Sequence, residues 1–129
     1  RPGADYGWPD VTYGAPYNEP NLPDGNWNFD RWNSTHEGYE KPMISWLPSI
    51  APSQVIRYKG DELAGWKGDL IIAAMIDESI RRVRLDGTRV VTDERIVIGQ
   101  RVRDLVELEK GELLLSFDNG DLVVMSLRN

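Results

Sequence analysis

The stretch GQRVRDLVELEKGELLLSFDNGDLVV, residues 99–124, contains three short apolar runs separated by two turn signals. The turn signals are Lys110-Gly111 and Asn119-Gly120, because glycine adopts a positive φ at little steric cost. No run shows the spacing of an amphipathic helix, so the stretch predicts a β-meander. Two cations, Arg101 and Arg103, stand at its beginning. As residues i and i+2 of a strand, they are expected to project from the same face.

The same alternation of apolar runs and turn signals extends through the whole C-terminal half. Lys67-Gly68 and Asp86-Gly87 mark two further turns, and no window sustains a helical period. This half is therefore predicted to be all-β. We predict strands near residues 54–58, 70–75, 79–85, 88–91, 95–98, 103–108, 112–117 and 121–127.

Two pairs of segments in this half form an internal repeat. KGDLIIA (67–73) returns as KGELLLS (110–116), 43 residues later, and IRRVRL (80–85) is echoed by LVVMSL (122–127) at an offset of 42. A period of roughly 40–45 residues with four short strands is typical of a propeller blade. Chance similarity between two hairpins produces the same pattern, and this alternative stays open.

The N-terminal segment, residues 1–48, has a different composition from the rest. It contains seven of the eight prolines and four of the five tryptophans. Such a segment is expected to be irregular and ordered, with its rings supplying the packing. The alternative is that the rings stack on sugars, and they are Tyr6, Trp8, Tyr13, Tyr17, Trp27, Trp32 and Tyr39.

Length and composition exclude several classes of protein. The chain has 129 residues, of which 40% are hydrophobic and 28% charged, with a formal net charge of −6. We expect one soluble domain over residues 1–129, with the loop-rich segment at 1–48 and the β-structure at 49–129. Nucleic acid and membrane are not expected partners. Without cysteine, and without a hydrolase motif, a histidine pair or an EF-hand pattern, the sequence indicates no catalytic residue and no metal ligand.

Three segments in order resemble one enzyme family. DYGWP (5–9), WLPSIAPSQVIRYKGDELAGWKGDLIIAAM (46–75) and GQRVRDLVELEKGELLLSFD (99–118) are similar to the soluble PQQ-dependent aldose, glucose and sorbosone dehydrogenases. Those proteins are six-bladed β-propellers, and the match corresponds to about their last third. The resemblance implies a partial six-bladed propeller of about two four-stranded antiparallel blades. It also suggests a periplasmic or secreted location, which the sequence itself does not determine.

The resemblance assigns a role to the two arginines. It implies that Arg101 and Arg103 hold the acidic quinone cofactor PQQ, and two guanidinium groups on one strand face suit its carboxylates. The alternative is that both arginines pair with Asp104, Glu107 or Asp93 at a solvated strand end. Trp46 is close to where the family places an aromatic wall beside the cofactor and substrate, and its alternative is a packing tryptophan.

Three departures from the family bear on catalysis. The histidine that serves as general base belongs to an earlier blade, and His36, in the aromatic loop, is not expected to replace it. Ile76 stands where family members carry a cofactor lysine. The family's calcium ligands precede the YGWP element. We therefore expect a segment of a sugar dehydrogenase that is not catalytically competent alone, the alternative being a noncatalytic module that binds a carbohydrate or protein partner.

A chain of about two blades cannot close a ring. Its open sheets would leave apolar faces and strand edges in water, so a partner is expected to cover them. Three copies of the chain would supply six blades, which predicts a homo-oligomer. The alternative is that the chain is a piece of a longer protein that carries the other blades.

Overall fold

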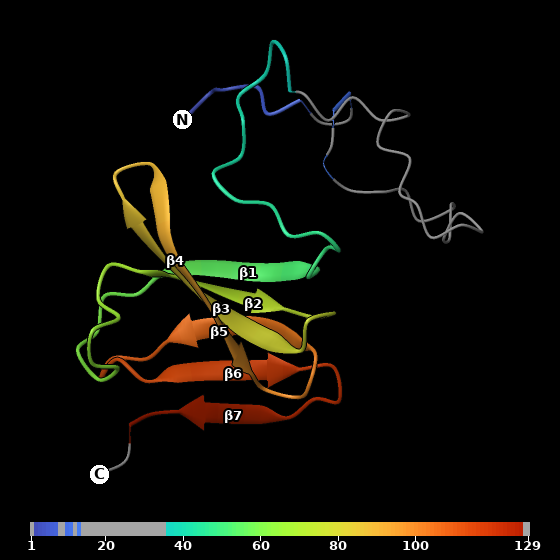
Figure 1. Cartoon of the computed structure of the whole chain (residues 1–129). Helices are drawn as coiled ribbons and strands as arrows, with labels where there is room; N and C mark the ends of the chain where they lie inside the picture. The colour runs from blue at the N-terminus through green and yellow to red at the C-terminus, as the bar shows by residue number, and fades with distance from the viewer. Residues whose placement is uncertain (1, 8–9, 12, 14–35, 128–129) are drawn as a thin grey trace. The chain divides into compact units, whose positions relative to one another are not determined.

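The computed structural model describes residues 2–7, 10–11, 13 and 36–127. The chain divides into two compact units, Arg1–Ser49 and Ile50–Asn129 (Figure 1). Each unit is described by itself. No helix that could serve as a membrane span occurs in the part of the chain that the structure describes.

The described part of the N-terminal unit is irregular chain organised by a few ring contacts. Tyr13 stacks on His36 with 4.3 Å between ring centroids, and Tyr39 Oη donates to Asp10 Oδ2 at 3.0 Å. Gly7 has a φ of 86°, and a Cβ at this position would lie 2.2 Å from Val11. These contacts are consistent with rings used for packing. Trp8, Tyr17, Trp27 and Trp32 lie outside the described residues.

The first part of the C-terminal unit forms a four-stranded antiparallel sheet, in the order β1-β2-β3-β4. Its strands are β1 (Pro52–Arg57), β2 (Leu70–Ala74), β3 (Ser79–Asp86) and β4 (Arg89–Val97). The prediction of two strands near 88–91 and 95–98 is wrong, because β4 runs unbroken through the polar residues between them. Asp93 and Glu94 stay in the strand since they reach Arg81 and Arg82 of β3, at 3.4 and 3.1 Å.

The second part of this unit forms a three-stranded antiparallel sheet, in the order β5-β6-β7. Its strands are β5 (Val102–Glu107), β6 (Leu113–Phe117) and β7 (Leu122–Met125). The predicted all-β meander is confirmed. The expected second set of four strands is not, because this sheet has three strands within the described residues.

The strand register confirms the internal repeat. In the first sheet Ala73 pairs with Gln54 on one side and with Ile80 on the other. In the second sheet Ser116, 43 positions after Ala73, pairs with Asp104 and Leu122 in the same way. The two sheets are therefore built on one pattern of strand pairing.

The core of the C-terminal unit lies where the two sheets meet. The first strands of the two sheets are neighbours, since β1 contacts β5 (Figure 1). Buried apolar side chains from both sheets form one cluster, which comprises Tyr58, Leu63, Ile71, Ala73, Ile80, Val102, Leu105, Leu113, Leu115 and Phe117. Burial of this cluster holds the two sheets against each other.

A buried tyrosine ties the two sheets together after β1. Tyr58 Oη donates to the carbonyl of Gly111 at 2.6 Å and accepts from the backbone N–H of Leu63 at 2.9 Å. Gly60 allows this close approach, because a Cβ there would lie 2.6 Å from the Cα of Gly111. The turn before β6 is thereby fastened to the loop after β1.

Candidate functional site

The arginine pair flanks Val102, the first residue of β5, which is the strand that meets the first sheet. Val102, between the two arginines, is completely buried, whereas the side chains of Arg101 and Arg103 are 42% and 57% exposed. Both guanidinium groups therefore lie on the solvent side of a strand whose other side is anchored in the core. This confirms the expectation that they share a face.

A β-bulge shapes the strand at this point. Val102 pairs with Phe117 and Asp104 pairs with Ser116, so Arg103 is an extra residue without a partner in β6. Bulges locally bend a strand and redirect side chains, and they are frequent next to functional sites. The sequence analysis missed this bulge. Its signal was the three-residue spacing between the buried residues Val102 and Leu105, where regular alternation requires two or four.

Both arginines bind one carboxylate, that of Asp118. Arg101 Nε donates to Asp118 Oδ2 at 2.7 Å, and Arg103 Nε donates to Asp118 Oδ1. The carboxylate comes from the turn between β6 and β7, and each of its oxygens serves one arginine. Of the expected alternative partners, Asp104 accepts a hydrogen bond from Gln54 Nε2 at 2.9 Å, Glu107 accepts one from the backbone N–H of Lys59, and Asp93 pairs with Arg81.

This contact alters the ionisation of the carboxylate. The hydrogen bond from Arg101, joined by that from Arg103 and by the attraction of both charges, holds the pKa of Asp118 below its usual value. Asp118 is therefore ionised at neutral pH. The charges of Arg101, Arg103 and Asp118 sum to one positive charge.

Two other carboxylates in the first sheet are each held by two arginines, and both are more enclosed. Asp69, with a side chain 4% exposed, accepts from Arg82 and Arg84. Asp77, with a side chain 17% exposed, pairs with Arg81 and Arg95.

The arginines of these two enclosed clusters also have further partners. Arg82 and Arg84 donate to the carbonyl of Gly65, and Arg82 also pairs with Glu94. Asp118, at 34%, is the most exposed of the three bridged carboxylates. The enclosed clusters fasten the first sheet, whereas the Asp118 cluster is open to solvent.

The comparisons with known proteins give a consistent answer. The family model described as Glucose / Sorbosone dehydrogenase matches residues 1–125. The chain belongs to the glucose/sorbosone dehydrogenase family.

Relatives and solved structures of this family resemble nearly the whole chain. The aldose sugar dehydrogenase YliI of Escherichia coli is 31% identical over 98% of the chain. A crystal structure of a glucose dehydrogenase matches 98% of the chain with 29% identity and a TM-score of 0.77. The apo-form crystal structure of the soluble aldose sugar dehydrogenase from Escherichia coli covers 95% of it with 28% identity and a TM-score of 0.70. The chain spans about a third of each: 34%, 36% and 34%.

Trp46, His36 and Ile76 do not belong to the arginine cluster. Trp46 is half-buried within the N-terminal unit, whereas the arginine pair belongs to the C-terminal unit. His36, in the same N-terminal unit, is buried and stacked on Tyr13. Ile76 is exposed in the turn between β2 and β3. Within residues 2–7, 10–11, 13 and 36–127, no group of three or more histidine, aspartate or glutamate side chains is arranged to hold a metal ion.

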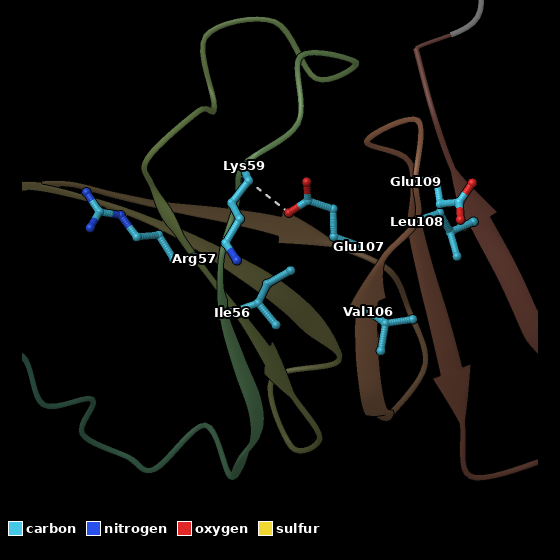
Figure 2. A pocket seen from close by; sticks show the side chains of 7 residues that line it. All are labelled: Ile56, Arg57, Lys59, Val106, Glu107, Leu108 and Glu109. Atoms are coloured by element: carbon cyan, nitrogen blue, oxygen red, sulfur yellow. Dashed lines mark hydrogen bonds between the residues drawn. The ribbon is translucent and has the colours of Figure 1, made fainter.

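An open groove lies near the C-terminal ends of β1 and β5, whereas the arginine pair is at the start of β5. Figure 2 shows the side chains that line the groove. It has a volume of about 680 Å³ and is lined by Ile56, Arg57, Lys59, Val106, Glu107, Leu108 and Glu109. The backbone N–H of Lys59 donates to Glu107 Oε2 at 2.9 Å. Because two basic and two acidic side chains line it, the groove has no net charge to attract an ion of either sign.

Proposed function

We propose that this chain is a cofactor-binding part of a PQQ-dependent sugar dehydrogenase, and that Arg101 and Arg103 bind carboxylates of the quinone. The observation that carries the proposal is the pair of guanidinium groups on one face at the start of β5. Among the described residues Asp118 takes only the two Nε groups, and the terminal nitrogens have a single weak contact, from Arg101 Nη2 to Met75 Sδ at 3.9 Å. Carboxylates are the anions that guanidinium forks bind best.

The residues present fit an acidic cofactor in three respects. The cluster carries a net positive charge, it is exposed enough to be reached, and its cations are anchored by the buried residue between them. When bound, PQQ would accept a hydride from the carbon that bears the sugar hydroxyl. This chain's own contribution is to bind and orient the cofactor's acidic groups. The general base and the calcium ligands would come from other parts of the family's fold.

We also propose that the two sheets are sectors of a six-bladed propeller. Two supports are that the first strands of the sheets adjoin and that both follow one pairing pattern. The chain also spans about a third of its relatives, as two blades out of six would. On this proposal residues 1–129 act as one propeller segment, and Trp46 would flank the cofactor. The mature enzyme would act in the periplasm or outside the cell, as the family resemblance suggests.

The propeller proposal requires partners for the open sheets. Edge strand β7 exposes Leu122, Val123 and Val124 to solvent by 67%, 45% and 51%. Apolar edges of this kind pair with further strands. We propose that neighbouring blades cover them, and that in a solution of this chain alone three copies do so.

Titration with PQQ, followed by absorbance, tests the cofactor proposal. We expect saturable binding that weakens about tenfold to a hundredfold in each of Arg101→Ala and Arg103→Ala, the range for a lost charge-assisted hydrogen bond. Arg89→Ala is the matched control, because Arg89 forms an exposed pair with Asp86 in the turn between β3 and β4. Equal affinity in all four proteins would refute the proposal.

A further inference from the structure

Asp118 contacts both arginines, and the sequence alone did not indicate a function for it. It accepts one hydrogen bond from the Nε of each arginine. Its carboxylate therefore fixes the orientation of two long side chains that each have several rotatable bonds. Arginine side chains lose about 0.5–1.5 kcal/mol of conformational freedom each when a ligand must order them.

The internal repeat provides a comparison within the same molecule. In the first sheet Pro52 and Gln54 pair as Val102 and Asp104 do in the second, which makes Ser53 the bulged residue equivalent to Arg103. By the same register, Ala51 corresponds to Arg101, and Met75 corresponds to Asp118. All three positions are uncharged in the first sheet and charged in the second. Asp118 is thus present only in the sheet that also carries Arg101 and Arg103, as a component of the same cluster.

The donor groups of the pair are used unequally. A guanidinium has five N–H groups, one on Nε and four on the terminal nitrogens. Asp118 takes the Nε group of each arginine. Among the described residues, the terminal nitrogens of Arg103 have no hydrogen-bond partner, and those of Arg101 have one weak contact, from Nη2 to Met75 Sδ at 3.9 Å. In the enclosed cluster around Asp69, by contrast, terminal nitrogens also donate to a backbone carbonyl.

We propose that Asp118 is a positioning residue, which holds Arg101 and Arg103 by their Nε groups so that their terminal nitrogens are presented together to a carboxylate ligand. This inference rests on the proposed function, because it concerns the same arginine pair. Asp118 would raise the affinity for the ligand through the two arginines, without touching the ligand itself.

The sign of one measurement distinguishes positioning from competition. If Asp118 only neutralised the arginines or occupied their ligand site, removing its charge would leave a more cationic pair and tighten anion binding. If Asp118 positions them, its removal weakens binding in spite of the more favourable charge. Asp118→Asn keeps the shape of the side chain but leaves a single acceptor oxygen for two donors.

The matched control is Asp121→Asn. Asp121 lies in the same turn, is exposed, and accepts a hydrogen bond from Asn119 Nδ2 at 2.7 Å. Its substitution removes the same charge from nearly the same place without touching the pair. We expect the Kd for PQQ to rise about five- to tenfold in Asp118→Asn, from the ordering of two side chains, and to stay the same or fall slightly in Asp121→Asn, which only removes a negative charge.

A second readout follows the arginines themselves. The Nε–H signals of Arg101 and Arg103, assigned by ¹⁵N NMR through their loss in Arg→Lys variants, should exchange with solvent faster in Asp118→Asn than in the wild type or Asp121→Asn. Citrate serves as a probe of the pair that is independent of PQQ. Citrate should shift both Nε–H signals in the wild type, and Asp118→Asn should need a higher citrate concentration for the same shift.

The outcomes separate this inference from the proposed function. Wild-type binding of PQQ with equal or tighter binding by Asp118→Asn would overturn the role of Asp118 and leave the cofactor proposal standing. Absence of PQQ binding, with citrate still acting through Asp118 as described, would overturn the cofactor proposal alone. If neither probe shifts either arginine signal, both are wrong.

Discussion

Ser53 Oγ of β1 donates a hydrogen bond of 2.7 Å to the carbonyl of Val102 in β5. The bond joins the bulges of the two neighbouring strands, because Ser53 is the extra residue of β1 and Val102 precedes the extra residue of β5. The acceptor residue, Val102, stands between Arg101 and Arg103 in the sequence, and its buried side chain anchors them. The contact between the sheets and the cationic cluster are therefore built on the same few residues.

Removing this bond should weaken the contact between the sheets. We expect Ser53→Ala to lower the free energy of unfolding by about 1 kcal/mol, the usual worth of a partly buried neutral hydrogen bond. Urea denaturation followed by tryptophan fluorescence measures it. Thr88→Ala, in the exposed turn between β3 and β4, is the control and should have no effect. Identical midpoints for both variants would contradict the role given to Ser53.

The hydroxyl of Tyr58 should contribute more, because it is buried and serves two backbone groups. Tyr58→Phe removes the partner of the Gly111 carbonyl and of the Leu63 N–H without changing the ring. We expect a loss of about 1–3 kcal/mol, since buried polar groups are left unpaired. Thermal unfolding checks this. Tyr39→Phe, whose hydroxyl bonds the exposed carboxylate of Asp10, should leave the melting temperature of the C-terminal unit unchanged.

The sequence was sufficient to predict most of the strands, the turns and the offset of the repeat. Apolar alternation and glycine turns depend on local chemistry, so they are visible along the chain. The bulge at Arg103 and the unbroken course of β4 were missed, because both depend on the partner strand. The contact of Asp118 with the arginines was missed for the same reason, since 15 residues separate it from Arg103 in sequence and only the pairing of β5 with β6 brings them together.

The stability of the C-terminal unit should depend on pH through its bridged carboxylates. Burial acts to raise the pKa of Asp69, but the hydrogen bonds from Arg84 and Arg82 outweigh it and the pKa is lowered. A lowered folded-state pKa gives stabilisation that is complete above the unfolded value of about 3.9 and is lost as pH falls through the folded value. Stability should therefore be constant near neutrality and fall below about pH 4.

Asp69→Asn tests the source of this dependence. At pH 7 we expect a loss on the order of 3 kcal/mol, because two arginines lose an enclosed counter-ion. The difference from the wild type should shrink as the pH is lowered, since protonation removes the same charge. Asp61→Asn is the control, as its pair with Lys67 is fully solvated. A difference that stays constant from pH 7 to pH 3 would show that ionisation of Asp69 is not involved.

Turnover is a separate matter from cofactor binding. We expect no detectable oxidation of glucose or other aldoses by the 129-residue chain with PQQ, calcium and a redox dye. Hydride transfer needs a general base at the sugar hydroxyl. We do not assign that role to His36, which is stacked on Tyr13. Robust activity would show that the missing machinery resides in this chain. A longer family member assayed in parallel is the positive control.

The open edge of the second sheet gives a prediction about assembly. If further blades cover β7, the isolated chain should form a ring of three copies, which light scattering would report as a mass of about three times 14.7 kDa. Val123→Lys should shift the mass toward the monomer, because a charge on an edge strand opposes further strand pairing. Val91→Lys on the other edge strand, β4, is an informative partner. The contact between the two sheets of one chain runs through β1, β2 and β5, so a ring contact that repeats it leaves β4 outside, and Val91→Lys should leave the mass unchanged. A well-folded monomer in the wild type would overturn the ring of three.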